Sequence, residues 1–206
     1  LEWFVKAALQ GHAGAQDNLG LRYEHGQGVE QDFEQAHGWY RKAAEQGFAS
    51  AQYHLGLLYD AGTGVERDTA EATAWFEKAA EQSHVRAQFE LGLRYEGGVH
   101  VKQDYQRAMA WYRRAADHDY APAQFMVGAL FDSIDTGMFD SRQAYTWYRK
   151  AAGLSEAIAL DGARWGARAA TTMFRSAELF FSLVTSPEFV QEPLRQAGTR
   201  LGALDA

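Results

Sequence analysis

The stretch Ala51-Gln52-Tyr53-His54-Leu55-Gly56-Leu57-Leu58-Tyr59 opens a unit that continues through a loop, residues 60–67, into a second segment, residues 68–80. The same pattern starts again at Ala15, Ala87 and Ala123, so the spacing is 36 residues each time. A fixed period of this size marks an array of supersecondary units. The sequence therefore predicts an all-α helical solenoid in which each unit packs on its neighbours.

Composition narrows the function classes. Of the 206 residues, 47% are hydrophobic and 14% aromatic, which is enough to bury a substantial core in one elongated repeat domain. A formal net charge of −7 argues against a nucleic-acid partner, because phosphate binding needs a basic face. The absence of cysteine excludes disulfides and thiolate metal sites. No apolar run approaches the ~20 residues that a membrane-spanning helix needs.

The first helix of each unit carries small and apolar residues at recurring offsets that lie on one side of a helix. Glycine returns inside this helix, although it costs ~1 kcal/mol relative to alanine. Its recurrence predicts a close helix contact, since a missing Cβ lets a neighbour approach the backbone. The recurring residues are Ala15, Leu19, Gly20 and Tyr23; Ala51, Leu55, Gly56 and Tyr59; Ala87, Leu91, Gly92 and Tyr95; and Ala123, Val127, Gly128 and Phe131.

A glycine-rich turn and a second helix follow. The turn Gly26-Gln27-Gly28-Val29 lacks the lysine and the preceding strand of a phosphate-binding loop, so it is interpreted as a tight interhelical turn. An aspartate then predicts an N-cap at residues 32, 68, 104 and 140. Gln35, Glu71 and Gln143 complete a capping-box pattern, which Arg107 breaks. The second helix repeats a Trp-aromatic pair opposite alanines, as in Trp39-Tyr40, and these rings are expected in the core.

The run read from Ala15 to Gly47 resembles the Sel-1-like repeat, a relative of the tetratricopeptide repeat. The resemblance covers residues 1 to about 154 and implies a right-handed superhelix of stacked antiparallel helix hairpins. It also implies that the protein acts as an adaptor in protein assemblies. In bacteria such adaptors often take part in envelope regulation, exopolysaccharide control or host interaction, and in eukaryotes they serve in protein quality control. His100, Ile134 and Gly137 depart from the turn pattern, so these two turns are expected to differ in shape.

The expected domain organisation is a solenoid over residues 1–154 followed by a different region. The solenoid contains a partial repeat, residues 1–14, and four repeats, residues 15–50, 51–86, 87–122 and 123–154. The chain opens inside a repeat, which suggests a fragment or a mature form. Residues 155–206 lose the period and are expected to form a helical C-terminal cap, with partner docking or oligomerisation as the alternative.

No catalytic, cofactor-binding or metal-binding residues are expected. The seven histidines form no zinc motif, and no nucleophile elbow or phosphate-binding loop occurs. A cysteine-rich branch of the resembled family has been linked to β-lactam binding or hydrolysis, but this chain lacks the cysteine pairs. The favoured function is a non-enzymatic scaffold that binds a protein or peptide. A structural spacer or regulatory module is the alternative, and a β-lactam hydrolase is a remote one.

The predicted partner-binding face occupies the side of each first helix that the tetratricopeptide resemblance places on the concave wall. Its aromatic and leucine side chains would form an apolar floor, and its carboxylates an acidic margin suited to apolar anchors flanked by Lys or Arg. The alternative is that these residues pack between adjacent first helices and that the acids are merely solvated. The positions are Asp17, Leu21, Glu24, Tyr53, Leu57, Asp60, Phe89, Leu93, Glu96, Phe125, Ala129 and Asp132. The partner's identity, the compartment (periplasmic or secreted, or cytoplasmic) and the oligomeric state are left open.

Overall fold

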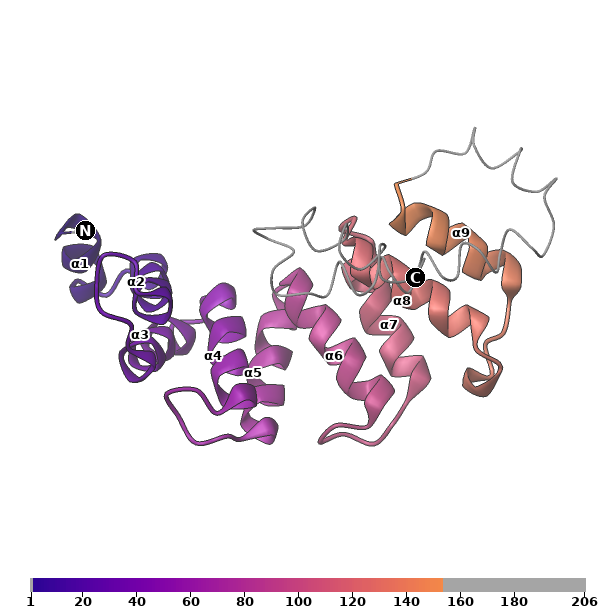
Figure 1. Ribbon diagram of the computed structural model, residues 1–206, viewed down its shortest axis with the longest axis horizontal. Helices are drawn as coiled ribbons and strands as arrows, with labels where there is room; N and C mark the ends of the chain where they lie inside the picture. Colours follow the sequence, from indigo (N-terminus) through magenta and orange to yellow (C-terminus); the bar gives the residue numbers. More distant parts are fainter. Residues whose placement is uncertain (1, 154–206) are drawn as a thin grey trace, which may run out of the picture. The chain divides into compact units, whose positions relative to one another are not determined.

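The computed structural model describes residues 2–153, with side chains from residue 5 onward. In this part of the chain every regular element is helical (Figure 1). The elements are α1 (Glu2–Leu9), α2 (Ala13–His25), α3 (Phe33–Glu45), α4 (Ala49–Ala61), α5 (Thr69–Glu81), α6 (Val85–Gly97), α7 (Tyr105–Ala116), α8 (Ala121–Asp132), the 3-10 helix η1 (Ile134–Thr136) and α9 (Ser141–Ala151). The expected C-terminal cap, residues 155–206, lies outside the described residues.

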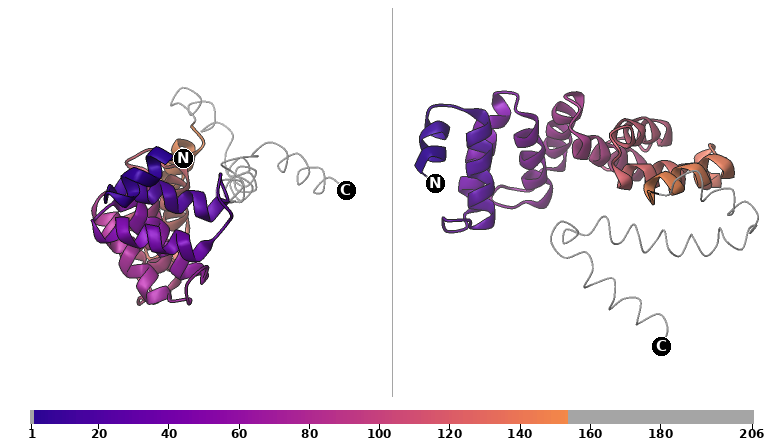
Figure 2. Two further views of the ribbon diagram at one scale, coloured as in Figure 1. Left: turned by 90° about the vertical axis from the view of Figure 1, so that its left-hand side faces the viewer. Right: turned by 90° about the horizontal axis from the view of Figure 1, so that it is seen from above.

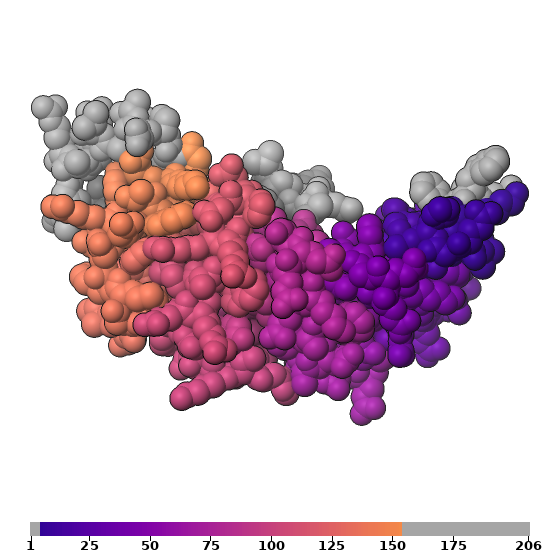
Figure 3. Space-filling view, turned by 180° about the vertical axis from the view of Figure 1, so that it is seen from behind, coloured from indigo at the N-terminus to yellow at the C-terminus, as the bar shows by residue number. Residues whose placement is uncertain are grey.

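The chain divides into two compact units, residues 1–115 and 116–206, which we describe separately. In the first unit each helix packs on the next one along the chain, from α1 through α6, and α8 packs on α9 in the second. In the right-hand view of Figure 2, the helices of residues 2–81, coloured from indigo to purple, follow one another in chain order. In the space-filling view, these repeats follow one another as bands from indigo to magenta (Figure 3). The predicted all-α fold of stacked helix hairpins is confirmed.

An aspartate caps the second helix of each hairpin, as predicted. The Asp32 carboxylate accepts a hydrogen bond from the Gln35 backbone N–H at 3.0 Å, and Asp104 accepts one from Arg107 at 2.9 Å. Asp68 and Asp140 each accept two first-turn N–H groups. These bonds satisfy amides that have no partner within the helix. The second helix therefore starts at a fixed residue in each repeat.

The aromatic core is built mainly from the residue after each tryptophan. Tyr40, Phe76 and Tyr112 are fully buried, whereas Trp75 is 8% exposed and Trp39 is half-buried. Trp75 and Trp111 each pack against the cluster of the preceding hairpin, and a Lys or Arg cation lies over the rings of Trp39, Trp75, Trp111 and Trp147. For example, Trp75 joins the cluster of the preceding hairpin, and the Lys78 ammonium lies 3.6 Å from its ring centroid. The prediction that the rings interlock successive hairpins is correct for this pair.

The glycines inside the first helices do mark close contacts. A Cβ built on Gly20 would lie 2.6 Å from the Tyr40 ring, and one on Gly56 would lie 2.7 Å from the Phe76 ring. Gly92 meets Tyr112 and Gly128 meets Tyr148 in the same way. The ring belongs to the second helix of the same hairpin. Glycine is therefore required where two helices of one hairpin cross.

The third and fourth turns were both expected to differ in shape. This prediction is wrong for the third turn and is confirmed for the fourth. His100 adopts φ +56°, the left-handed conformation that Gly28 and Gly64 adopt at the equivalent positions. Histidine tolerates this conformation better than branched residues do, so the third turn keeps its backbone shape. The fourth turn differs, because α8 ends at Ser133 in an extended conformation and η1 follows.

Candidate partner-binding face

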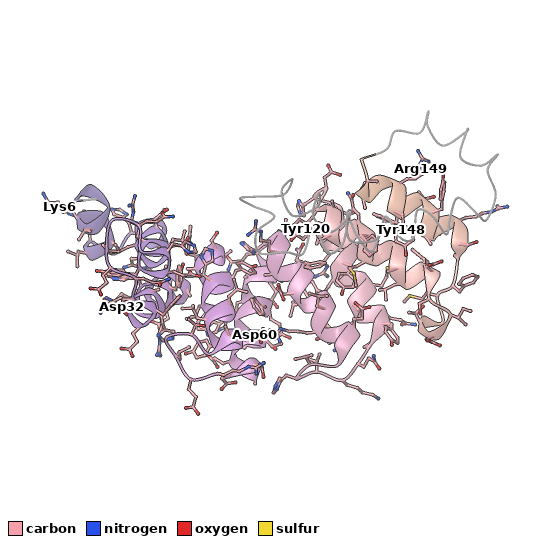
Figure 4. The ribbon with its side chains drawn as sticks, viewed as in Figure 1. Lys6, Asp32, Asp60, Tyr120, Tyr148 and Arg149 are labelled. Carbon is pink, nitrogen blue, oxygen red and sulfur yellow. The ribbon has the colours of Figure 1, made fainter. Side chains whose placement is uncertain are left out.

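The first helices of residues 1–115 lie side by side and are linked by polar contacts. Nδ1 of His54 on α4 lies 2.9 Å from the Asp17 carboxylate on α2. The Arg94 guanidinium on α6 lies 2.9 Å from the Asp60 carboxylate at the end of α4, beside the turn (Figure 4). Because these links join equivalent helices of successive repeats, α2, α4 and α6 present one surface, which we call the first-helix face.

The predicted floor residues Asp17, Tyr53 and Phe89 are buried, with exposed fractions of 5%, 8% and 6%. The Tyr53 ring contacts Phe76 at 5.8 Å and His84 at 4.7 Å between centroids, and Phe89 contacts Tyr112 at 5.6 Å. The expectation of an uncovered floor is therefore wrong at these three positions. Asp17 contacts His54 on the next first helix, as the alternative interpretation held, whereas Tyr53 and Phe89 also contact rings on the second helix of their own hairpins.

Phe125, the equivalent residue of the second unit, is half-buried, and its ring centroid lies 5.1 Å from that of Tyr148 on α9.

The leucines of the prediction remain at the surface. Leu21, Leu57 and Leu93 are half-buried on α2, α4 and α6. Leu21 and Leu57 each pack against a core cluster and are partly exposed. Since the three occupy the same position of successive repeats, they form a row along the first-helix face. Ala129 holds this position on α8 and is also half-buried.

The predicted acidic margin is largely tied into the fold. Glu24 accepts a hydrogen bond from the Tyr40 hydroxyl at 2.5 Å, and Glu96 accepts one from the Tyr112 hydroxyl at 2.6 Å. Burial, together with the neighbouring glutamate, raises the pKa of both phenols, so they remain donors. Burial also raises the pKa of Glu96, although its tyrosine partner opposes the shift.

The second repeat pairs its carboxylate differently, because Phe76 has no hydroxyl. Asp60 instead binds Arg94 of the next repeat, whose guanidinium lies 4.9 Å from the Phe76 ring centroid. The alternative interpretation expected Glu24, Asp60 and Glu96 to be merely solvated. Each of them is instead bonded to another side chain of the fold. At Asp132, in the second unit, burial raises the pKa of the carboxyl group.

A row beside the leucines changes its chemistry from repeat to repeat. Asn18, His54 and Glu90 lie three residues before Leu21, Leu57 and Leu93, so each shares a side of its helix with a leucine. Asn18 is exposed, and the other two are half-buried. Burial raises the pKa of Glu90, an effect that Arg94 opposes and Asp60 reinforces. The first-helix face thus combines a constant apolar row with a variable polar one.

Sequence reasoning missed a buried glutamine in every repeat. The amide of Gln52 donates to the Ala44 carbonyl of the preceding helix at 3.2 Å and accepts from Gln82 at 2.7 Å. Gln16, Gln88 and Gln124 make the same donation, to Ala8, Ala80 and Ala116. The residue equivalent to Gln82 in the third repeat is His118, and the Gln88 carbonyl oxygen has no hydrogen-bond donor among the described residues. The return of glutamine every 36 residues was the signal that could have revealed these links.

His84 gives the N-terminal unit a pH-dependent stability. Its Nδ1 accepts the Ala87 backbone N–H at 3.3 Å, and burial, then His54 and Arg86, lower its pKa from 6.5 to about 4, against an opposing effect of Asp17. The unfolded chain therefore binds a proton first as the pH falls through 6.5, and stability is lost between there and about pH 4.

We expect the melting temperature of the wild type to fall relative to that of His84→Asn between pH 7 and pH 4.5. Asparagine also caps a helix but does not titrate in this range. Parallel melting curves over this range would contradict the assignment.

Within residues 2–153, no group of three or more His, Asp or Glu side chains is placed to hold a metal ion. Within the same range, no helix is long and apolar enough to cross a membrane.

Comparisons with known proteins identify the repeat. The family model described as Sel1 repeat matches residues 1–12, 13–48, 49–84, 85–120 and 121–155. No curated protein matches the chain.

Solved structures with a similar fold come from bacteria. A Sel1 repeat protein from Oxalobacter formigenes is 41% identical, with a TM-score of 0.67, over 70% of this chain and 57% of the other. A protective antigen of uropathogenic Escherichia coli strains, with an SLR fold, is 40% identical, with a TM-score of 0.69, over 74% and 32%. An immunity protein from Pseudomonas aeruginosa is 26% identical, with a TM-score of 0.50, over 73% and 55%. The chain thus spans about half or less of the length of these relatives.

Proposed function

Because the chain belongs to the Sel1 repeat family, we propose that it is a non-enzymatic scaffold that binds a peptide or a partner's helix on its first-helix face. The family generally serves as a scaffold for protein–protein interactions. The relatives described as a protective antigen and as an immunity protein support a bacterial regulatory, envelope or host-interaction role.

The observation that carries this proposal is the contrast between constant and variable positions in the repeats. The packing positions hold glycine and a fully buried ring in every repeat of the N-terminal unit. The accessible row of Asn18, His54 and Glu90 changes completely, although it lies beside leucines that do not change. Folding alone explains the constant residues. A surface that selects one ligand would explain why this polar row beside the leucines differs from repeat to repeat.

The chemistry of this face defines its ligand. Half-buried leucines favour aliphatic or aromatic anchors, and such a face suits an extended or helical peptide. Burial raises the pKa of the Glu90 carboxyl even though Arg94 opposes the shift, so a Lys or Arg beside the anchors would stabilise its ionised form. A structural spacer would not need the leucine row, and a β-lactam hydrolase would need a catalytic group that the residues of this face do not provide.

A double substitution in the leucine row tests the proposal. Leu57→Gln with Leu93→Gln removes two apolar anchors and is expected to weaken partner binding by about tenfold or more, and added salt should weaken wild-type binding. The control is Glu34→Gln with Glu77→Gln, two exposed positions of α3 and α5. Affinity capture from a bacterial lysate finds the partner, and titration of its binding segment measures the loss. If the leucine variant is folded and binds as tightly as the control, the first-helix face is not the binding surface.

A further inference from the structure

The turn between α8 and α9 is built differently from the other three. In those turns a polar side chain donates to a carbonyl in the last turn of the preceding helix. Gln31 reaches Glu24 at 2.8 Å, Arg67 reaches Asp60 at 2.9 Å, and Gln103 reaches Glu96 at 2.8 Å. The equivalent residue of the fourth turn is Phe139, whose side chain has no donor.

Thr136 closes the fourth turn in its place. Its hydroxyl donates toward the Leu130 carbonyl at 2.8 Å and the Ser133 carbonyl at 2.9 Å, and its oxygen accepts the Met138 backbone N–H at 3.2 Å. The backbone N–H of Asp140 donates to the Phe131 carbonyl at 2.7 Å. The turn is therefore held in one conformation without any contribution from the Phe139 side chain.

Two side chains of the fourth turn, which take no part in its hydrogen bonds, are apolar and exposed. Ile134 is 78% exposed and Phe139 is 57% exposed, where the third turn has Gly98 and Gln103. Scattered exposed apolar residues are common, but two within six residues of one hydrogen-bonded turn are harder to explain by chance. The fold does not require them, since three other turns close with glycine and a polar residue. A preordered apolar pair also loses little conformational entropy on binding.

The charge of this turn indicates which kind of partner could bind to the apolar pair. Asp132, Asp135 and Asp140 surround the apolar pair in sequence, and the nearest cation along the chain is Arg142, in the first turn of α9. A second copy of the chain would bring the same carboxylates and a further formal charge of −7 to the contact. Like charges facing one another oppose association, whereas a cationic partner would be attracted.

We propose that Ile134 and Phe139, with the carboxylate of Asp135, form a second interaction surface, the fourth-turn patch. Its partner is a protein segment in which apolar side chains are flanked by Lys or Arg. This inference is independent of the first-helix face, because it concerns a different unit of the chain and different residues.

The test uses a fluorescein-labelled peptide, Gly-Lys-Leu-Phe-Lys-Gly, and fluorescence polarisation with the whole chain. Two comparison peptides carry Glu in place of Lys, or Ser in place of Leu and Phe. Binding is expected to be strongest for the first peptide and to weaken with salt. Ile134→Thr with Phe139→Gln should reduce its affinity by about tenfold or more. Val99→Thr, at an exposed apolar residue of the third turn, should leave it unchanged.

Methionine methyl NMR locates the binding site. The Met138 resonance, from the turn itself, should move when the peptide is added, and that of Met126, which is 8% exposed on α8, should not. The proposal is overturned if no peptide binds, if the Glu peptide binds equally well, or if the folded double variant keeps its affinity. A concentration-dependent dimer that the double variant abolishes would also overturn it, because the patch would then join two copies of this chain.

Discussion

Gly56→Ala is expected to lower the free energy of unfolding by ~1–3 kcal/mol, whereas Gly38→Ala is expected to raise it by ~0.5–1 kcal/mol. Alanine has a higher helix propensity than glycine, so propensity alone predicts that both substitutions stabilise the protein. The two sites differ in tertiary contact. A Cβ at residue 56 would lie 2.7 Å from the Phe76 ring, while one at residue 38, inside α3, meets nothing within 4 Å.

The steric cost at residue 56 cannot be relieved cheaply. The Phe76 ring is fully buried and packed among Ala72, Ala79 and Leu91, so it has no free space into which it can move. Gly56→Leu should therefore destabilise the protein further than the alanine variant. Urea denaturation followed by circular dichroism measures all three changes. Changes of opposite sign at residues 56 and 38 would support the contact, and stabilisation by both alanines would refute it.

Asp60→Asn is expected to lower the free energy of unfolding by ~2 kcal/mol, because it removes the carboxylate that forms an ion pair with a buried guanidinium. The Arg94 side chain is 5% exposed, and its Nε already lacks a hydrogen-bond acceptor among the described residues. The Asp60 side chain is 38% exposed, so water compensates for part of the lost interaction. The loss of stability should therefore be smaller than for a fully buried ion pair.

Glu24→Gln is the matched control for this prediction. Its partner is the neutral Tyr40 hydroxyl, and an amide oxygen can still accept that hydrogen bond, so a cost of ~0.5–1 kcal/mol is expected. Asp60→Asn combined with Arg94→Met should recover stability relative to Asp60→Asn alone, since it removes the unpaired charge and leaves an apolar side chain over Phe76. If the double variant is no more stable than the single one, Arg94 does not depend on Asp60. Both measurements use the same denaturation experiment.

The sequence by itself determined the helix hairpins and the caps of their second helices. These depend on local chemistry: an aspartate before each second helix, a glycine where a helix stops, and a 36-residue period that only an array of equivalent units explains. The close contacts at the repeated glycines were also predictable, because nothing else justifies their cost inside a helix. Family membership follows from the same pattern.

Only the tertiary structure decided which side chains of the predicted face are accessible. A helical wheel places Tyr53 and Leu57 on the same side of α4, but adjacent hairpins cover the first and leave the second at the surface. It also decided the partners of the acids: Asp60 pairs with Arg94 of the next repeat, whereas Glu24 and Glu96 accept a hydrogen bond from a tyrosine of their own hairpin. Burial and pairing depend on what the neighbouring repeat brings into contact. The periodicity of a single helix does not show which side chains the neighbouring repeat places against it.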